Sequence, residues 1–380
     1  MADEITSESF IPAVIILSCV MVVGFVGNLH VIFVYAFRLK PTNHGFFIIV
    51  LSIYDISACT VLIPFMIYMY INPWTYGSVF MCRISRFMMG LIFDGSILTL
   101  LLVAVYRYRK ICRPHGWQIK NRVAKLLCFI SAISACVCSC PLIVFSEVST
   151  HSLGNKTFTV CGAVEGTIKY GLYYYIFLAL MAFVSLCALV SLYACILKAA
   201  SILHAKESYG DVNKSGVTGL KHIKLNVLNR HKELPTSCSK IIVSPEVGYN
   251  QDNIEGKTRD NSETLATCSA NQIKTETTYD NLLRRNRIRQ ITLAFILVTV
   301  FFCISYIPFL SLQIVMKQRQ MSSSYLTIDS YIAIRITMTC IYINSMVNCF
   351  IYSCFDRQFR QEIGMLYKTL CRRRKDRRSN

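Results

Sequence analysis

The stretch Met81–Ile111, MCRISRFMMGLIFDGSILTLLLVAVYRYRKI, decides the fold of this chain. An α-helix rises about 1.5 Å per residue, so this stretch is long enough to cross the roughly 30 Å of hydrocarbon in a bilayer. Backbone polar groups find no water there, and a closed helical hydrogen-bond pattern is expected. The stretch is therefore predicted to be a membrane-spanning helix.

Six further stretches of the same kind lie on either side: Pro12–Phe37, Phe46–Ile71, Val123–Phe145, Tyr170–Ile196, Ile288–Val315 and Leu326–Phe355. A soluble chain of 380 residues with 54% hydrophobic and 16% charged residues would expose too much apolar surface. The sequence predicts an all-α membrane protein with seven spanning helices and argues against a soluble enzyme.

The basic residues that produce the net charge of +19 cluster between particular spans, which argues against a nucleic-acid partner. They gather between spans three and four, before span six and at the carboxyl end, whereas residues 1–10 contain acidic residues and no Lys or Arg. The positive-inside rule places the amino terminus outside and the carboxyl terminus in the cytoplasm. No cleavable signal peptide is expected.

Most of the 18 cysteines lie within apolar spans, where they act as small buried hydrophobic residues. Cys82 begins span three on the outer side and Cys161 lies in the second outer loop, so both face the oxidising compartment. We predict that they form a disulfide; two free thiols are the disfavoured alternative. Asn155 in the same loop begins an Asn-Lys-Thr sequon and is a candidate glycosylation site.

Cys82 and Arg107 are 25 residues apart (107 minus 82), or about 37 Å of helix, which matches one tilted passage of the bilayer. Further markers lie in spans one, two and six and in the first outer loop: Gly27, Asn28, Leu51, Ser52, Asp55, Trp74 and Pro308. With them the chain resembles the rhodopsin-like (class A) G-protein-coupled receptors over nearly its whole length, the long inner loop excepted. The resemblance implies a seven-helix bundle with an amphipathic eighth helix.

The resemblance also assigns residues to activation. It implies that Arg107 meets a heterotrimeric G protein, and that Pro308 is the pivot for an outward movement of span six. The residues assigned to coupling and activation are Tyr106, Arg107, Tyr193, Phe302, Tyr306, Pro308, Asn348 and Tyr352. Tyr106 stands where the family has an acidic residue, so we expect a weaker resting contact to Arg107 and higher basal signalling.

Cys349 stands where the family has a proline, and Tyr306 where it has a tryptophan. Both positions belong to the activation machinery. We expect these departures to leave the fold intact and to alter the efficiency of switching.

Asp55 lies in the middle of span two, where a lone carboxylate costs several kcal/mol and needs partners or a cation. The family-matching partners are Ser96, Asn344, Ser345 and Asn348. Together they resemble the sodium pocket of these receptors, and a polar network without an ion is the alternative. No other cofactor and no other metal site is expected, because no His, Cys or carboxylate cluster has ligand spacing.

The candidate ligand pocket comprises Arg86, Met89, Asp94, Tyr306, Arg335 and Tyr342. Met89 replaces the Asp of amine receptors, and Tyr342 replaces the retinal lysine of opsins. Arg86 and Arg335 suit an acidic ligand, so a short peptide such as a neuropeptide is the leading expectation and a lipid acid the second. Asp94 either pairs with a cationic ligand group or bonds a neighbouring Ser or Tyr.

We expect an outer tail at residues 1–10, a receptor domain with its eighth helix at 11–366, a disordered inner loop at about 199–286 and a basic cytoplasmic tail at 367–380. Cys371, beside this basic run, is a candidate palmitoylation site. Arrestin, receptor kinases and membrane lipids are expected partners at the plasma membrane. A non-signalling decoy receptor is the alternative to a signalling one, and a transporter or enzyme is least favoured.

Overall fold

The computed structural model describes residues 7–72, 77–153, 156–163, 168–214, 289–315 and 328–379. Within these ranges, 7 helices are long and apolar enough to cross a membrane: Glu8–Arg38, Asn43–Ile71, Val79–Cys112, Asn121–Val144, Tyr170–Ile202, Arg289–Val315 and Ile332–Phe355. Each coincides with one of the predicted stretches. The prediction of an all-α seven-span bundle is confirmed.

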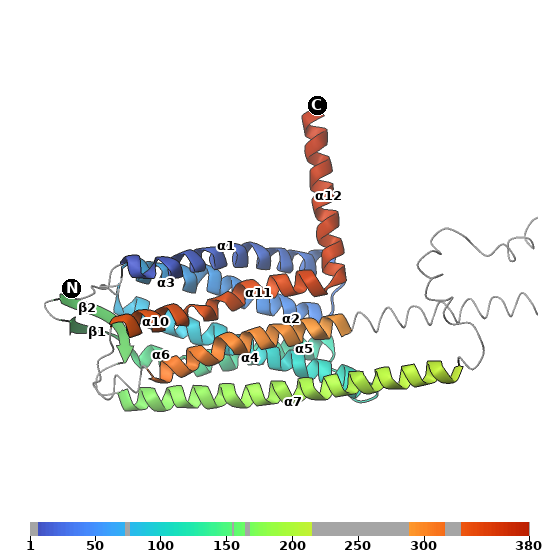
Figure 1. The fold of residues 1–380 in the computed structure, drawn as a ribbon, viewed down its shortest axis with the longest axis horizontal. Coiled ribbons are helices and arrows are strands. Elements are labelled where there is room, and N and C mark those ends of the chain that lie inside the picture. The colour runs from blue at the N-terminus through green and yellow to red at the C-terminus, as the bar shows by residue number, and fades with distance from the viewer. Residues whose placement is uncertain are drawn as a thin grey trace, which may run out of the picture. The chain divides into compact units, whose positions relative to one another are not determined.

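The chain divides into two compact units, Met1–Leu197 with Arg287–Asn380 as the first and Lys198–Asn286 as the second. Within the first unit the spanning helices run side by side as a bundle (Figure 1). The candidate site residues belong to this unit, as do the membrane-spanning segments apart from residues 198–202 at the end of the fifth.

The first two spans each contain a π-helical segment. The 3-10 turn η1 (Ser7–Phe10), α1 (Ile11–Phe33) and the π-helical η2 (Val34–Arg38) form the first span. The second consists of α2 (Asn43–Ser57), the π-helical η3 (Ala58–Leu62) and α3 (Ile63–Ile71). Single π-helical turns widen a helix locally and are frequent at functional sites.

Spans three to five are formed by α4 (Val79–Cys112), by α5 (Asn121–Ser139) with the short α6 (Pro141–Val144), and by α7 (Ile168–Lys214). The helix Arg289–Val315 forms the sixth. The seventh consists of α10 (Ile328–Met338) and α11 (Cys340–Phe355), interrupted at Thr339. The hydroxyl of Ser78 caps α4 by accepting a hydrogen bond from the Met81 backbone N–H, 3.2 Å away.

A β-hairpin lies between α6 and α7 and was not predicted. Its strands are β1 (Ser146–Leu153) and β2 (Lys156–Ala163), antiparallel in a register that pairs Ser146 with Ala163 and Leu153 with Lys156. Figure 1 shows the hairpin at one end of the bundle. The signal was present in the sequence, because a Gly-Asn pair, Gly154 and Asn155, separates two segments rich in Val and Thr.

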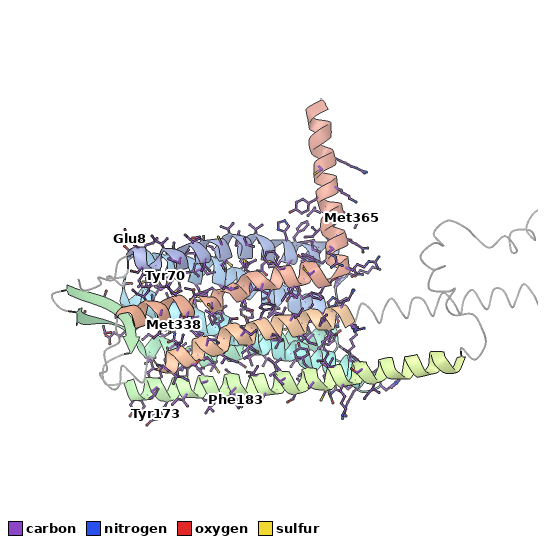
Figure 2. The ribbon with its side chains drawn as sticks, in the orientation of Figure 1. Glu8, Tyr70, Tyr173, Phe183, Met338 and Met365 are labelled. Carbon is purple, nitrogen blue, oxygen red and sulfur yellow. A yellow bond between two sulfur atoms is a disulfide. The ribbon has the colours of Figure 1, made fainter. Side chains whose placement is uncertain are left out.

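The outward faces of the helices carry large apolar side chains. Tyr173 and Phe183 on α7 are 65% and 63% exposed and point away from the bundle (Figure 2). In water this surface would be costly, whereas in hydrocarbon it is the expected exterior. The structure therefore describes a multi-pass membrane protein.

The predicted eighth helix is α12 (Arg357–Ser379), which leaves the end of α11 in a different direction from the bundle (Figure 1). It continues to Ser379 and so includes most of residues 367–380, which the sequence analysis assigned to a separate basic tail. Asp356 lies at the junction between α11 and α12, where its backbone N–H still bonds the Tyr352 carbonyl at 2.9 Å.

Candidate functional site

The end of the bundle at which α4 begins is covalently tied to the hairpin. Cys82 on α4 and Cys161 on β2 form a disulfide with their Cα atoms 5.5 Å apart, as predicted. Arg86, one turn further along α4, donates from Nη2 to the Cys161 carbonyl at 3.2 Å. This predicted pocket residue therefore also holds the hairpin against α4.

The predicted pocket residue Arg335 lies on α10 against the ring of Tyr70, which was not among the predicted site residues. Its guanidinium is 5.1 Å from the Tyr70 ring centroid, and its carbonyl accepts a 2.8 Å hydrogen bond from the Tyr70 hydroxyl. Phe10 stacks on the other side of Tyr70 at 5.0 Å and is 1% exposed. The segment before α1 thus contacts α3 and α10 at this end of the bundle.

Deeper in the bundle, four aromatic side chains from three spans meet. The Phe93 ring lies 6.2 Å from Tyr306, 6.1 Å from Phe309 and 6.3 Å from Tyr342. Two of the four, Tyr306 and Tyr342, are predicted pocket residues. Met89, a third, is half-buried one turn above Phe93.

Asp94 follows Phe93 and interacts through its carboxyl group with the Tyr306 hydroxyl. Its Oδ2 is buried and has no hydrogen-bond partner. The structure therefore brings Asp94 to a neighbouring Tyr, one of the two alternatives that the sequence left open, and leaves one carboxyl oxygen free for a further donor.

Asp55 lies in the predicted polar network and is 4% exposed. Its Oδ2 accepts a 2.8 Å hydrogen bond from Asn348 Nδ2, and Ser345 also interacts with its carboxyl group. Ser96, by contrast, donates its hydroxyl to the Ile92 carbonyl of its own helix at 2.7 Å. The structure therefore joins spans two and seven at Asp55, and Ser96 is bonded within α4.

The buried oxygens around Asp55 fit the requirements of a small hard cation. The side-chain oxygens Oδ1 of Asn344, Oδ1 of Asn348 and Oγ of Ser52 are buried and have no hydrogen-bond partner. Carboxylate, amide and hydroxyl oxygens are the ligands that such cations prefer. Ser52 was not among the predicted site residues and adds a hydroxyl oxygen as a possible cation ligand from the same helix as Asp55.

Arg107, near the carboxyl-terminal end of α4, is 1% exposed although it is charged. Its guanidinium carbon lies 5.8 Å from the Tyr106 ring centroid and 5.3 Å from that of Phe295. Its Nε and Nη2 have no hydrogen-bond partner. The Tyr106 hydroxyl accepts from Lys110 Nζ at 3.2 Å, so this phenol is engaged elsewhere.

Two of the other predicted activation residues, Tyr193 and Tyr352, lie in the region of Arg107 on two further spans, whereas Asn348 lies at Asp55 and Tyr306 at Phe93. Tyr193 on α7 and Tyr352 on α11 are 6% and 1% exposed, and both hydroxyls are buried without a partner. The Tyr352 ring lies edge-on to Phe295 at 6.3 Å. Farther along the helix Arg289–Val315, Phe302 packs on Tyr306 at 5.1 Å, and the exposed Pro308 follows Tyr306 by two residues.

This arrangement can be compared with known proteins. The family model described as 7 transmembrane receptor (rhodopsin family) matches residues 27–352. The chain belongs to this family. The receptor is accordingly not an enzyme.

Several curated receptors resemble segments of this receptor. Neuropeptide Y receptor type 1 of Xenopus laevis is 33% identical over 141 residues, which are 36% of this chain and 37% of that protein. Neuropeptide Y receptor type 2 of Gallus gallus is 29% identical over 172 residues, 43% and 44% of the two chains. The C3a anaphylatoxin chemotactic receptor of Oncorhynchus mykiss is 29% identical over 153 residues, 39% and 41%. The matched segments thus span less than half of these relatives.

The receptor lacks the family's proline after Asn348, and Cys349 takes part in a close contact between α1 and α11 instead. A Cβ added to Gly27 would overlap Cys349 Sγ and lie 3.0 Å from Cys349 Cβ, so a larger residue there requires Cys349 to shift. One turn from Cys349 along α11, the Ser345 carbonyl accepts a 2.7 Å hydrogen bond from Asn28. The departure in sequence is therefore accommodated by close helix packing.

The structure describes one of the two predicted modification sites. Asn155 lies outside the described residues. Cys371 is exposed on α12 and its thiol is free. Both modifications remain predictions.

Proposed function

We propose that this receptor binds a short extracellular peptide and activates a heterotrimeric G protein by outward movement of the helix Arg289–Val315. The observation that carries the proposal is the group of buried, unpartnered polar atoms of Arg107, Tyr193 and Tyr352 at the inner end of the bundle. Such atoms cost free energy in the resting bundle. A partner that enters when the sixth span moves outward would satisfy them.

Two observations support a peptide ligand. The relatives are named as receptors for neuropeptide Y and for the C3a anaphylatoxin. Arg86 and Arg335 place two guanidinium groups in the predicted pocket, and guanidinium recognises carboxylates well. A lipid acid offers the same carboxylate and is the second candidate.

The test is a screen in cells that express the receptor with a panel of G-protein sensors, using a peptide library and a set of fatty and lysolipid acids. A peptide response that disappears in Arg107→Ala, at matched surface expression, supports the proposal. Responses to lipid acids alone would show that the ligand is a lipid acid and not a peptide. A receptor that binds a peptide and activates no G protein would be a decoy, the alternative that Tyr106 and Cys349 favour.

We also propose that the amino terminus faces outward at the plasma membrane and that the carboxyl terminus is cytoplasmic. The basic segments of the chain support this orientation. Arrestin and receptor kinases would then act on the Ser and Thr residues of the inner loop, and Cys371 would carry a palmitoyl chain near the lipid headgroups.

A sodium ion is proposed at Asp55, held by Asn344, Asn348 and Ser345 with Ser52 as a further ligand. Bound there, it would supply positive charge to the buried carboxylate and stabilise the resting bundle. Replacing choline by sodium should raise the melting temperature of the purified receptor by several degrees, and Asp55→Asn should abolish this rise. A rise of equal size in the variant would place the sodium effect elsewhere.

A further inference from the structure

Arg107 carries a positive charge in the interior of the bundle without a carboxylate beside it. Its side chain is buried, and Tyr106 stands at the neighbouring position where the family has an acidic residue. Among the residues that the structure describes, none forms an ion pair with Arg107. Moving a guanidinium from water into a low-dielectric interior costs more free energy than cation-π contacts return, so the rings of Tyr106 and Phe295 do not balance the charge.

Two donors on one edge of this guanidinium have no acceptor in the described part of the chain. They are Nε and Nη2 of Arg107, and both are buried. In a planar guanidinium these two nitrogens share an edge and direct their N–H bonds almost in parallel, which is the fork that binds an anion with two hydrogen bonds. Buried polar groups are nearly always hydrogen-bonded, so a bound acceptor is expected at this edge.

A hydroxyl donor from another span lies in the same region. The Phe295 ring lies 5.3 Å from the Arg107 guanidinium carbon and meets the Tyr352 ring of α11 edge-on at 6.3 Å. The Tyr352 hydroxyl is buried and likewise has no partner among the described residues. Three donors, two from α4 and one from α11, are therefore buried here without an acceptor.

The charges around Tyr106 favour an anion over a neutral acceptor. The guanidinium carbon of Arg107 lies 5.8 Å from the Tyr106 ring centroid, and Lys110 Nζ lies 5.4 Å from it, so two cations flank one ring. The Tyr106 hydroxyl already accepts from Lys110 at 3.2 Å. A water molecule would satisfy the three donors and leave the positive charge unbalanced, whereas an anion does both.

The carboxylates at the start of α12 are engaged elsewhere. Asp356 accepts a 2.6 Å hydrogen bond from the Tyr35 hydroxyl through Oδ2, and its Oδ1 accepts from the first backbone N–H groups of α12. Glu362 forms a 3.1 Å ion pair with Arg38. Neither carboxylate is bonded to the Nε and Nη2 edge of Arg107.

We propose that Arg107 binds a small inorganic anion, chloride, in the resting receptor. The anion accepts hydrogen bonds from Nε and Nη2 of Arg107 and from the Tyr352 hydroxyl, and it supplies the negative charge that Tyr106 lacks. It stabilises the bundle by binding to the folded state. This deepens the proposed function, on which only the signalling readout rests, because the G protein displaces the anion when it meets Arg107.

The first test compares the melting temperature of the purified receptor, without G protein, in sodium chloride and in sodium gluconate of equal ionic strength. The sodium concentration is the same in both, so the site proposed at Asp55 is equally filled. Chloride should raise the melting temperature by about 2 to 4 °C in a saturable manner, and bromide should replace it. Equal melting temperatures in the two salts would overturn the proposal.

The second test asks whether Tyr352 is a ligand. Tyr352→Phe keeps the ring on Phe295 and removes the hydroxyl, so the chloride concentration that gives half of the rise should increase by a factor of roughly five. Tyr342→Phe, whose ring contacts Phe93, is the control and should leave this concentration unchanged. An unchanged concentration in Tyr352→Phe would overturn the three-donor site.

The third test separates a bound anion from a general effect of salt. The carboxylate of Tyr106→Asp supplies the missing charge, so chloride should lose its effect on the melting temperature, whereas Tyr106→Asn is neutral, serves as the matched control and should keep it. Arg107→Gln should lose the effect as well. A rise of the same size in all three variants would overturn the proposal. If the rise follows this pattern in a receptor that activates no G protein, the anion site is upheld and the proposed function is contradicted.

Discussion

Tyr106, which stands where the family has an acidic residue, shows how one side chain affects the contacts of Arg107. Its hydroxyl accepts from Lys110 at 3.2 Å and its ring packs on Phe47 at 5.6 Å. The Arg107 guanidinium, 5.8 Å from the same ring, keeps two unpartnered nitrogens. We predict that the resting state is held by weaker interactions than an adjacent ion pair would supply.

Restoring the acid should strengthen the resting state. Tyr106→Asp is expected to lower ligand-free G-protein signalling by a factor of about three, because a buried carboxylate attracts Arg107 more strongly than a phenol ring does. Tyr106→Phe keeps the ring and is the control, expected to stay near the unmodified level. Basal signalling per receptor at the cell surface is the measurement, and an increase in Tyr106→Asp would contradict this account.

Among the helices, the contact between α1 and α11 depends on the absence of a side chain. Gly27 and Cys349 are so close that a Cβ at Gly27 would overlap the sulfur and lie 3.0 Å from Cys349 Cβ. Asn28 strengthens the same contact through the Ser345 carbonyl. α11 also carries Asn348 and Ser345, the neighbours of Asp55, so the position of α11 sets the geometry of that network.

Gly27→Ala should therefore push α1 and α11 apart and destabilise the receptor by about 1 to 3 kcal/mol, the usual cost of overpacking. Gly364→Ala is the matched control, because a Cβ there has no atom within 4 Å and alanine favours a helix. Melting temperatures of the two purified variants test whether Gly27→Ala destabilises the receptor and Gly364→Ala does not. A Gly27→Ala variant as stable as the unmodified receptor would show that the contact is loose.

Hydropathy alone located the helices well, and the reason is physical. The cost of placing polar groups in hydrocarbon acts on every residue of a span, so stretches such as Pro12–Phe37 and Val123–Phe145 coincide with helices in the structure. The Cys82–Cys161 disulfide followed from compartment and position, and the Asp55–Asn348 bond from the family resemblance.

The contacts that were missed join residues distant in sequence. Tyr35 and Asp356 are 321 positions apart, and no local periodicity marks them as partners. Phe10 likewise reads as part of a short tail, although it is buried against Tyr70. The hairpin was a different case, since its Gly-Asn signal was legible but lay between much stronger apolar stretches.

For the whole molecule, the distribution of basic residues predicts one orientation in the membrane. An epitope placed before Met1 should be reached by antibody on intact cells, and one placed after Asn380 only after permeabilisation. The paired tags serve as controls for each other. Labelling of the carboxyl-terminal tag on intact cells would reverse the assignment of inner and outer ends.

The most direct test of the account is nucleotide exchange by purified G proteins in the presence of the receptor in lipid nanodiscs. Exchange without ligand should exceed that of empty nanodiscs for at least one G protein of a panel, and Arg107→Ala should remove the excess, because we propose the buried guanidinium as the group that the G protein meets. If Arg107→Ala, folded as judged by its melting temperature, leaves the excess intact, or if no G protein in the panel responds, the central claim is contradicted.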